Sequence, residues 1–151
     1  MSLTGYKRVA PDKVNIINLA TANIVVSLRL APLGNPDLHQ QYVDNVVEIV
    51  ERYIAYHNSP NCIVSIRNTV FSSIGTVANG NQTNIVVKAT GTIIAVINPY
   101  GGNSLFDLSL INGVAHASEV YIASIGRYQK SLATDKVMAN RQQALHKIMR
   151  R

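Results

Sequence analysis

Apolar side chains recur at every second position between residues 24 and 30, as Ile24, Val26, Leu28 and Leu30. A period of two is typical of a β-strand, because successive side chains of a strand point to opposite faces of the sheet. The preceding residues 14–22 fit either an extension of this strand or a short helix capped by Asp12, and the pattern does not choose between them. The residues before Asp12 are interpreted as a polar N-terminus without a regular element.

A helix is predicted to begin at Asn35-Pro36-Asp37. Asn35 can cap the helix, Pro36 suits the first helical position, and Asp37 faces the positive end of the helix dipole. The residues that follow carry an apolar stripe at helical spacing, formed by Tyr42, Val43, Val46, Val47, Ile49, Val50, Tyr53 and Ile54. Asn58-Ser59-Pro60-Asn61 is expected to end this helix.

Antiparallel strands are predicted after the helix. One strand runs from Cys62 to Val70 and can continue to Val77. Asn79-Gly80 predicts a tight hairpin turn, since both central residues of such a turn need a positive φ. The return strand is expected over residues 85–89.

Gly91 breaks this second strand's alternation, which resumes at Ile94 and Val96. A glycine at such a position indicates either a bulge or a second reversal of the chain. Residues 99–102, Pro-Tyr-Gly-Gly, are expected to close the sheet region.

Two helices are predicted at the C-terminal end. The first opens at Ser104 to Asp107, which has the form of a capping box with Asp in place of Glu. It is apolar almost all round, and its small residues let another backbone approach closely. These residues are the candidate oligomer interface: Gly113, Ala117 and Gly126. A second, separate helix is expected from about Thr134 to Arg151.

The expected fold is therefore α+β. A single antiparallel sheet of about four to five strands has helices packed on one face, in the order β-α-β-β-(β)-α-α. Residues 1–133 form the body, and residues 134–151 form a basic amphipathic C-terminal helix of the same domain. No internal repeat is recognised.

The amino-acid composition is compatible with a subunit of a larger assembly. Of the 151 residues, 47% are hydrophobic and only 15% are charged, against about 25% in an average soluble protein. Asn occurs fifteen times. An uncharged polar surface on an Ile/Val-rich frame is common in subunits of larger assemblies, although an ordinary globular domain can have it too. Self-association, or association with other subunits, is therefore expected.

Nothing in the sequence indicates a secreted or membrane protein. No signal peptide is visible, since charged residues interrupt the first twenty positions. The longest apolar stretch, residues 105–125, contains Asp107, His116 and Glu119, which are costly in lipid. We expect an intracellular setting, or a particle assembled in a cell, without a membrane partner.

The net charge is confined to the end of the chain. Residues 1–126 hold seven bases and seven acids, whereas residues 127–151 hold seven bases and only Asp135 as an acid, a net +6. Nucleic acid is the most common partner of such a basic stripe, and an acidic protein surface is the next candidate. The candidate binding residues are Arg127, Lys130, Lys136, Arg141, Lys147, Arg150 and Arg151.

No catalytic motif, cofactor motif or metal-ligand set is found. The glycines form no phosphate-binding loop, and no nucleophile elbow is present. His116 and Glu119 lie three positions apart and would share a helix face, but no second pair supports a metal or acid–base site. We therefore predict no catalytic residues, no metal and no cofactor, and we do not expect an enzyme.

The function hypothesis is a non-enzymatic structural subunit of a virion or another nucleoprotein complex. Its basic C-terminal helix would contact nucleic acid or an acidic neighbour. The alternative is a free-standing nucleic-acid-binding or regulatory module that uses the face of the sheet.

Overall fold

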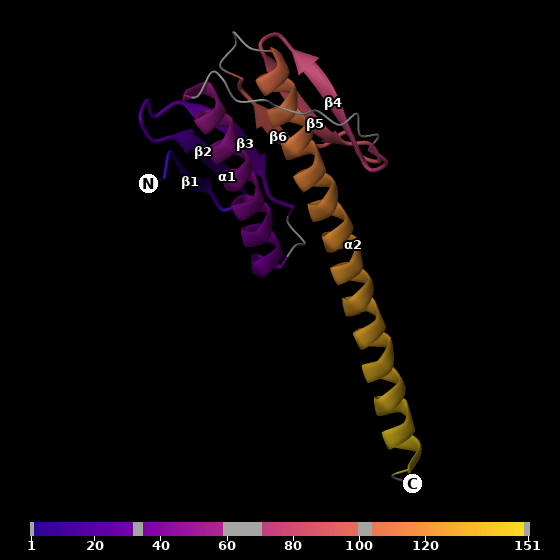
Figure 1. The fold of residues 1–151 in the computed structure, drawn as a ribbon. Coiled ribbons are helices and arrows are strands. Elements are labelled where there is room, and N and C mark those ends of the chain that lie inside the picture. The colour runs from indigo at the N-terminus through magenta and orange to yellow at the C-terminus, as the bar shows by residue number, and fades with distance from the viewer. Residues whose placement is uncertain (1, 32–34, 59–70, 100–103, 150–151) are drawn as a thin grey trace.

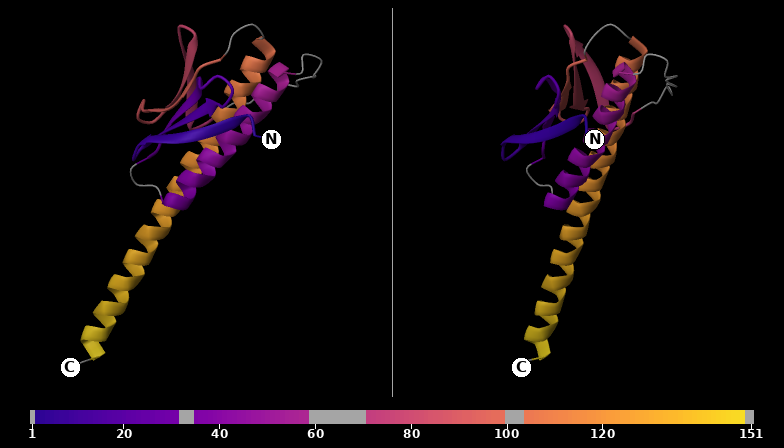
Figure 2. Two further views of the ribbon diagram at one scale, coloured as in Figure 1. Left: turned by 90° about the vertical axis from the view of Figure 1, so that its left-hand side faces the viewer. Right: turned by 60° about the vertical axis from the view of Figure 1, so that its left-hand side comes forward.

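The fold is a six-stranded antiparallel sheet with two helices. The computed structural model describes residues 2–31, 35–58, 71–99 and 104–149, with side chains described as far as residue 132 except for Ser104. The elements are β1 (Thr4–Ala10), β2 (Lys13–Asn18), β3 (Ile24–Arg29), α1 (Pro36–Asn58), β4 (Ile74–Asn79), β5 (Gln82–Val87), β6 (Ile93–Ile97) and α2 (Ser104–Met149). The sheet order is β1-β2-β3-β6-β5-β4. Both helices lie on one face of the sheet (Figures 1 and 2).

The expected α+β class and antiparallel sheet are confirmed, but the expected strand number and element order were wrong. Three strands precede α1, because β1 and β2 form a hairpin where a polar terminus was expected. β1 is an edge strand, and Tyr6, Lys7, Arg8 and Val9 on it are exposed. Such a strand shows little apolar alternation, so its pattern resembles that of a loop.

The chain contains an internal structural repeat, contrary to the sequence interpretation. Each half of the molecule is a three-stranded meander followed by a helix, β1-β2-β3-α1 and then β4-β5-β6-α2. From each edge of the sheet inward the strands follow one another in chain order, β1-β2-β3 from one edge and β4-β5-β6 from the other. β3 and β6 pair antiparallel in the middle. The two halves are therefore related by an approximate two-fold axis between β3 and β6.

The second hairpin of each half is equivalent in detail. Each has a bulge after the isoleucine at the centre of the strand pair, at Ile16 in one half and at Ile85 in the other. Each turns through a residue of positive φ, Ala22 at 61° and Gly91 at 71°. Aligning the two hairpins on these features makes five positions identical: Asn15/Asn84, Ile16/Ile85, Ala20/Ala89, Thr21/Thr90 and Ile24/Ile93.

The helices of the two halves are equivalent as well, with Glu51 of α1 corresponding to Glu119 of α2. Glu51 accepts hydrogen bonds from the backbone N–H of Leu3 at the start of β1, at 2.7 and 3.0 Å. Glu119 accepts a bond of 2.9 Å from the N–H of Ser73 beside β4. In the same alignment Val46 corresponds to Val114, and both are 0% exposed. A buried valine from each helix thus lies in the middle of the core.

Several local predictions are confirmed. β3 and α1 lie where the periodicity placed them, and the Asn35 side chain caps α1 by accepting a bond of 2.6 Å from the N–H of Asp37. Residues 14–22 are neither an extension of β3 nor a helix: β2 ends at Asn18, and a turn joins it to β3, with which it pairs antiparallel. Gly91 marks a second reversal, between β5 and β6.

Other local predictions need correction. In the β4–β5 hairpin Asn79 pairs with Gln82, so the central residues are Gly80 and Asn81. Among the described residues only Gly80 of this pair has a positive φ, 61°, which fits a turn with glycine first. The strand expected over residues 62–70 lies outside the described residues, and its expected continuation overlaps β4.

The two C-terminal helices expected from the sequence are one helix, α2, of 46 residues. No proline interrupts residues 104–149, and a single Gly126 costs only about 1 kcal/mol in a helix. The helix expected to begin at about Thr134 is therefore a continuation of α2. The side chain of Ser104, the expected cap, lies outside the described residues.

Candidate functional site

The projecting half of α2 is the feature that distinguishes the two repeats. α1 has 23 residues and ends at Asn58, whose equivalent in α2 is Gly126. The helix nevertheless continues to Met149, and at 1.5 Å per residue it is about 70 Å long. Figures 1 and 2 show this half leaving the body as a single helix. Residues 127–149 have no helical counterpart in the described part of the first repeat.

The candidate binding residues begin where α2 leaves the body. Arg127 and Lys130 are exposed, and a guanidinium nitrogen of Arg127 donates a bond of 3.2 Å to the hydroxyl of Ser124. Lys136, Arg141 and Lys147 belong to α2, but their side chains lie outside the described residues. Arg150 and Arg151 lie outside them altogether. Five of the seven candidates therefore share one continuous helix.

The candidate interface glycine and alanine lie in the contact between the chain's own helices. A Cβ atom added at Gly113 would meet Cγ2 of Ile49 on α1 at 2.8 Å. Ala117 is buried, and it lines a small cavity together with Tyr42 and Tyr121. A Cβ atom at Gly126 would meet nothing within 4 Å. Self-association through these residues stays a prediction.

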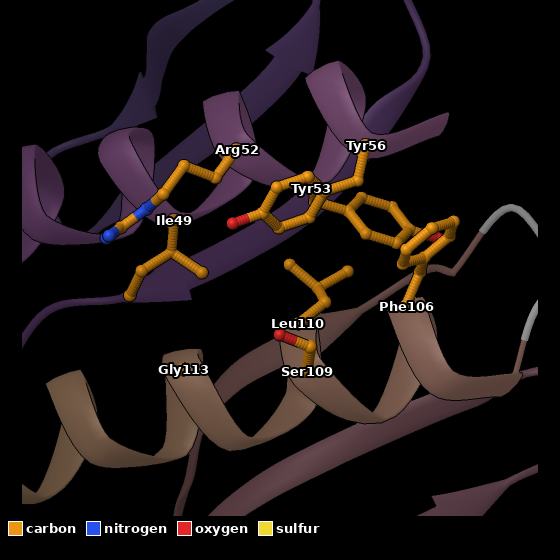
Figure 3. A pocket seen from close by; sticks show the side chains of 8 residues that line it. All are labelled: Ile49, Arg52, Tyr53, Tyr56, Phe106, Ser109, Leu110 and Gly113. Atoms are coloured by element: carbon orange, nitrogen blue, oxygen red, sulfur yellow. The ribbon is translucent and has the colours of Figure 1, made fainter. Parts of the chain in front are cut away.

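The helix–helix contact contains two equivalent clusters, one on each side of the axis. Figure 3 shows the first, a cavity of about 140 Å³ lined by Ile49, Arg52, Tyr53, Tyr56, Phe106, Ser109, Leu110 and Gly113. The second has about 10 Å³ and is lined by the eight equivalent residues, Leu38, Gln41, Tyr42, Asn45, Ala117, Val120, Tyr121 and Ser124. The two cavities correspond because the equivalent helices α1 and α2 pack against each other about the approximate two-fold axis.

Tyrosine hydroxyls bridge the helices in both clusters. Tyr53 of α1 donates to Asp107 of α2 at 2.6 Å, and its equivalent Tyr121 of α2 lies 2.7 Å from Nδ1 of His39 on α1. Tyr121 also accepts a bond from the N–H of Ala31, and its ring stacks on Tyr42 at 4.2 Å. Burial raises the pKa of both Tyr42 and Tyr121, so these hydroxyls stay protonated. Their role here is to join the helices.

Glu119 has a structural partner instead of forming a site with His116. Its carboxylate accepts bonds from the hydroxyl and the N–H of Ser72, at 2.7 and 2.9 Å, and from the N–H of Ser73. These bonds lower the pKa of Glu119, the Ser72 hydroxyl most strongly. Among the described residues no three His, Cys, Asp or Glu side chains gather as a metal site would require.

Two equivalent clefts open at the ends of the pairing between β3 and β6, which covers only three residue pairs. One cleft, of about 570 Å³, is lined by Asn18, Thr21, Asn23, Ile24, Asn98 and Pro99. The other, of about 430 Å³, lies where α2 leaves the body. It is lined by Asp12, Arg29, Leu30, Ala31, Val87, Thr90, Thr92, Ile93, Ile94 and Ile122. Sequence reasoning missed both clefts, because they depend on the repeat.

Comparison with protein-family models, with curated proteins and with solved structures finds no match for this chain. In the described part of the chain no helix is long and apolar enough to span a membrane.

Proposed function

We propose that this chain is a non-enzymatic assembly subunit of a nucleoprotein complex, such as a virus particle. In this proposal the body contacts other subunits, and the projecting half of α2 binds nucleic acid. One observation carries the proposal: the part of α2 that leaves the body, residues 127–149, holds five bases and one acid, a net +4 out of the chain's +6.

In the described part of the chain, the projecting half of α2 lacks the tertiary packing that stabilises most helices. Helices of this size without tertiary packing are marginally stable in water, because packing supplies most of their stability. The helix from residue 127 onward has no neighbouring element among the described residues, and Leu132 on it is 47% exposed. A partner that covers this segment would therefore stabilise it.

The spacing of residues along α2 favours an anionic partner on one side. Positions eleven apart lie on nearly the same side of a helix, since eleven residues make about three turns. Val114 and Ile125 are buried in the body, and the next positions of this series are Lys136 and Lys147. Two lysines thus occupy the helix positions that follow the buried Val114 and Ile125 at this spacing.

Binding to nucleic acid is tested by its dependence on salt. Each neutralised phosphate of a duplex releases condensed counterions, so about four to six contacts give a log–log salt slope of roughly −4 to −5. We expect the full chain to show this slope on duplex DNA and a shallower one on single strands. A chain without residues 135–151 should lose binding at physiological salt while its circular dichroism still reports a folded body.

A charge variant of full length provides the matched control. Lys136→Gln/Arg141→Gln/Lys147→Gln keeps good helix-forming residues and removes three charges, so it should weaken binding in the same direction as truncation. If the truncated chain binds as tightly as the full one, the face of the sheet is the binding surface and the alternative module is correct. Light scattering adds a second criterion, because a strict monomer that binds nucleic acid also favours that module.

A further inference from the structure

The two ends of the sheet are equivalent in structure but carry different charges. At the end where α2 leaves the body, Lys13 of β2 pairs with Arg29 of β3, and both are exposed. In the alignment of the two hairpins, the equivalent residues at the opposite end are Gln82 of β5 and Asn98 after β6. The repeat therefore has equivalent backbone at both ends: one carries Lys13, Arg29 and the acid Asp12, and the other carries the uncharged Gln82, Asn98 and Asn81.

The fold does not require these two charges. Like charges directly opposite each other on neighbouring strands are destabilising, and exposed charges contribute little to stability in any case. The uncharged pair at the other end occupies the equivalent position, which shows that this backbone accommodates neutral residues. Together with the neighbouring Asp12, Lys13 and Arg29 leave a net charge of +1 at this end, which an anion that binds there would explain.

The surroundings suit an anion with several oxygens. Arg29 lines the cleft of about 430 Å³ together with Thr90 and Thr92, and the hydroxyl of Thr90 donates to that of Thr92 at 2.9 Å. Asp12 also lines this cleft, and the nearby Glu119 carboxylate is occupied by Ser72 and Ser73. Lys88 is exposed at the same end, but its ammonium already donates to the carbonyl of Phe71 at 2.8 Å. Lys13 and Arg29 are therefore the residues on which the inference rests.

The cleft is continuous with α2. Ile122 lines it, and Arg127 lies little more than one turn further along the same helix. From Ile122 to Lys136 the helix rises about 21 Å, which is close to the length of six base pairs of duplex DNA. One nucleic acid can thus reach both the cleft and the projecting half of α2.

We propose that this end of the sheet, formed by Lys13, Arg29 and the hydroxyls of Thr90 and Thr92, is a second phosphate-binding surface for the nucleic acid that α2 holds. The inference rests on the proposed function and deepens it. The nucleic acid lies along α2 and extends over the end of the sheet, and the opposite, uncharged end is free for contacts between subunits.

The test removes or moves the two charges. Lys13→Gln/Arg29→Asn gives this end the residues of its neutral counterpart. Adding Gln82→Lys/Asn98→Arg to that variant restores the net charge at the opposite end, at the equivalent positions of the repeat. On a duplex of about 20 base pairs near 50 mM salt, we expect either variant to weaken binding on the order of tenfold for each lost contact. The salt slope should become shallower by about 2.

The variant with moved charges decides the outcome. If it binds as well as the unmodified chain, only the net charge matters, and the inference is wrong while the proposed function stands. If the unmodified chain itself does not bind the duplex, the proposed function fails and this inference fails with it. Thermal unfolding of each variant confirms that a loss of binding does not come from a loss of folding.

Discussion

At the scale of single residues, the two repeats reach the same helix spacing with different pairs of side chains. Gly113 of α2 faces Ile49 of α1, and the equivalent positions hold Asn45 and Ala117. A large residue and a glycine on one side of the axis thus correspond to two residues of intermediate size on the other. The tight contact at Gly113 therefore belongs to the packing within one chain.

Enlarging Gly113 should destabilise the fold. Since a Cβ atom there lies 2.8 Å from Ile49, Gly113→Leu is expected to cost ~1–3 kcal/mol by overpacking, measured by thermal or urea unfolding. Gly126→Ala is the control, and with open space around it the change should raise helix stability slightly. Gly113→Asn/Ile49→Ala copies the other side of the axis and should recover stability. Equal melting temperatures for Gly113→Leu and the unmodified chain would contradict this account.

Two equivalent glutamates should make the stability depend on pH. Burial acts to raise the pKa of Glu51, but hydrogen bonds from the start of β1 outweigh it and lower the pKa below its usual value; the pKa of Glu119 is also lowered. The folded chain therefore binds fewer protons than the unfolded chain. The stabilisation is complete above the unfolded pKa and is lost as the pH falls through the folded pKa.

The experiment compares three glutamine variants. Glu51→Gln and Glu119→Gln should lower the free energy of unfolding at pH 7, and the difference from the unmodified chain should shrink as the pH falls from about 6 to about 3. Glu48→Gln is the control, because its side chain is 72% exposed and lies 4.0 Å from Arg52, a surface pair of little energetic value. A difference that stays constant with pH would show that these carboxylates do not stabilise the fold through their charge.

At the scale of elements, the periodicity of apolar residues predicted the strand and the helix that are buried on one side. β3 and α1 have a full apolar stripe and a clear start or end, so their positions follow from the sequence. β1 is different, because an edge strand with four consecutive exposed residues has no such stripe. The length of α2 was also missed, because two helices were expected where residues 104–149 form one, although no proline interrupts them.

The two halves of α2 should differ in local stability. Residues 106–125 pack on the sheet and on α1, whereas residues 127–149 lack such packing among the described elements. Hydrogen exchange should therefore be slow in the first segment and fast in the second, because an unpacked helix opens easily. Adding duplex DNA should slow exchange in the second segment. Equal protection in the free chain would mean that another element covers the projecting half.

At the scale of the whole molecule, the sequence predicted the charge distribution but not the repeat. The net charge of +6 over residues 127–151 is visible directly from the order of residues. The repeat is harder to see, because few positions of even the best-matched hairpin are identical and the helices align with an offset different from that of the strands. The clefts at Arg29 and Asn98, and the unequal charge of the two ends, could not be predicted before the repeat was known.

The approximate two-fold axis has a consequence for how this sequence tolerates change. Each position of α1 has an equivalent position in α2, and each position of the hairpin β2–β3 has one in the hairpin β5–β6. A complete scan of single substitutions for folding should therefore give two profiles with shared maxima, as at Val46 and Val114, and differences where the packing differs, as at Gly113 and Asn45. In a scan for biological activity, the two profiles should differ at Lys13 and Arg29, because the equivalent residues, Gln82 and Asn98, occupy the same places in the fold without a charge. The molecule thus contains its own reference for distinguishing residues kept for the fold from residues kept for a partner.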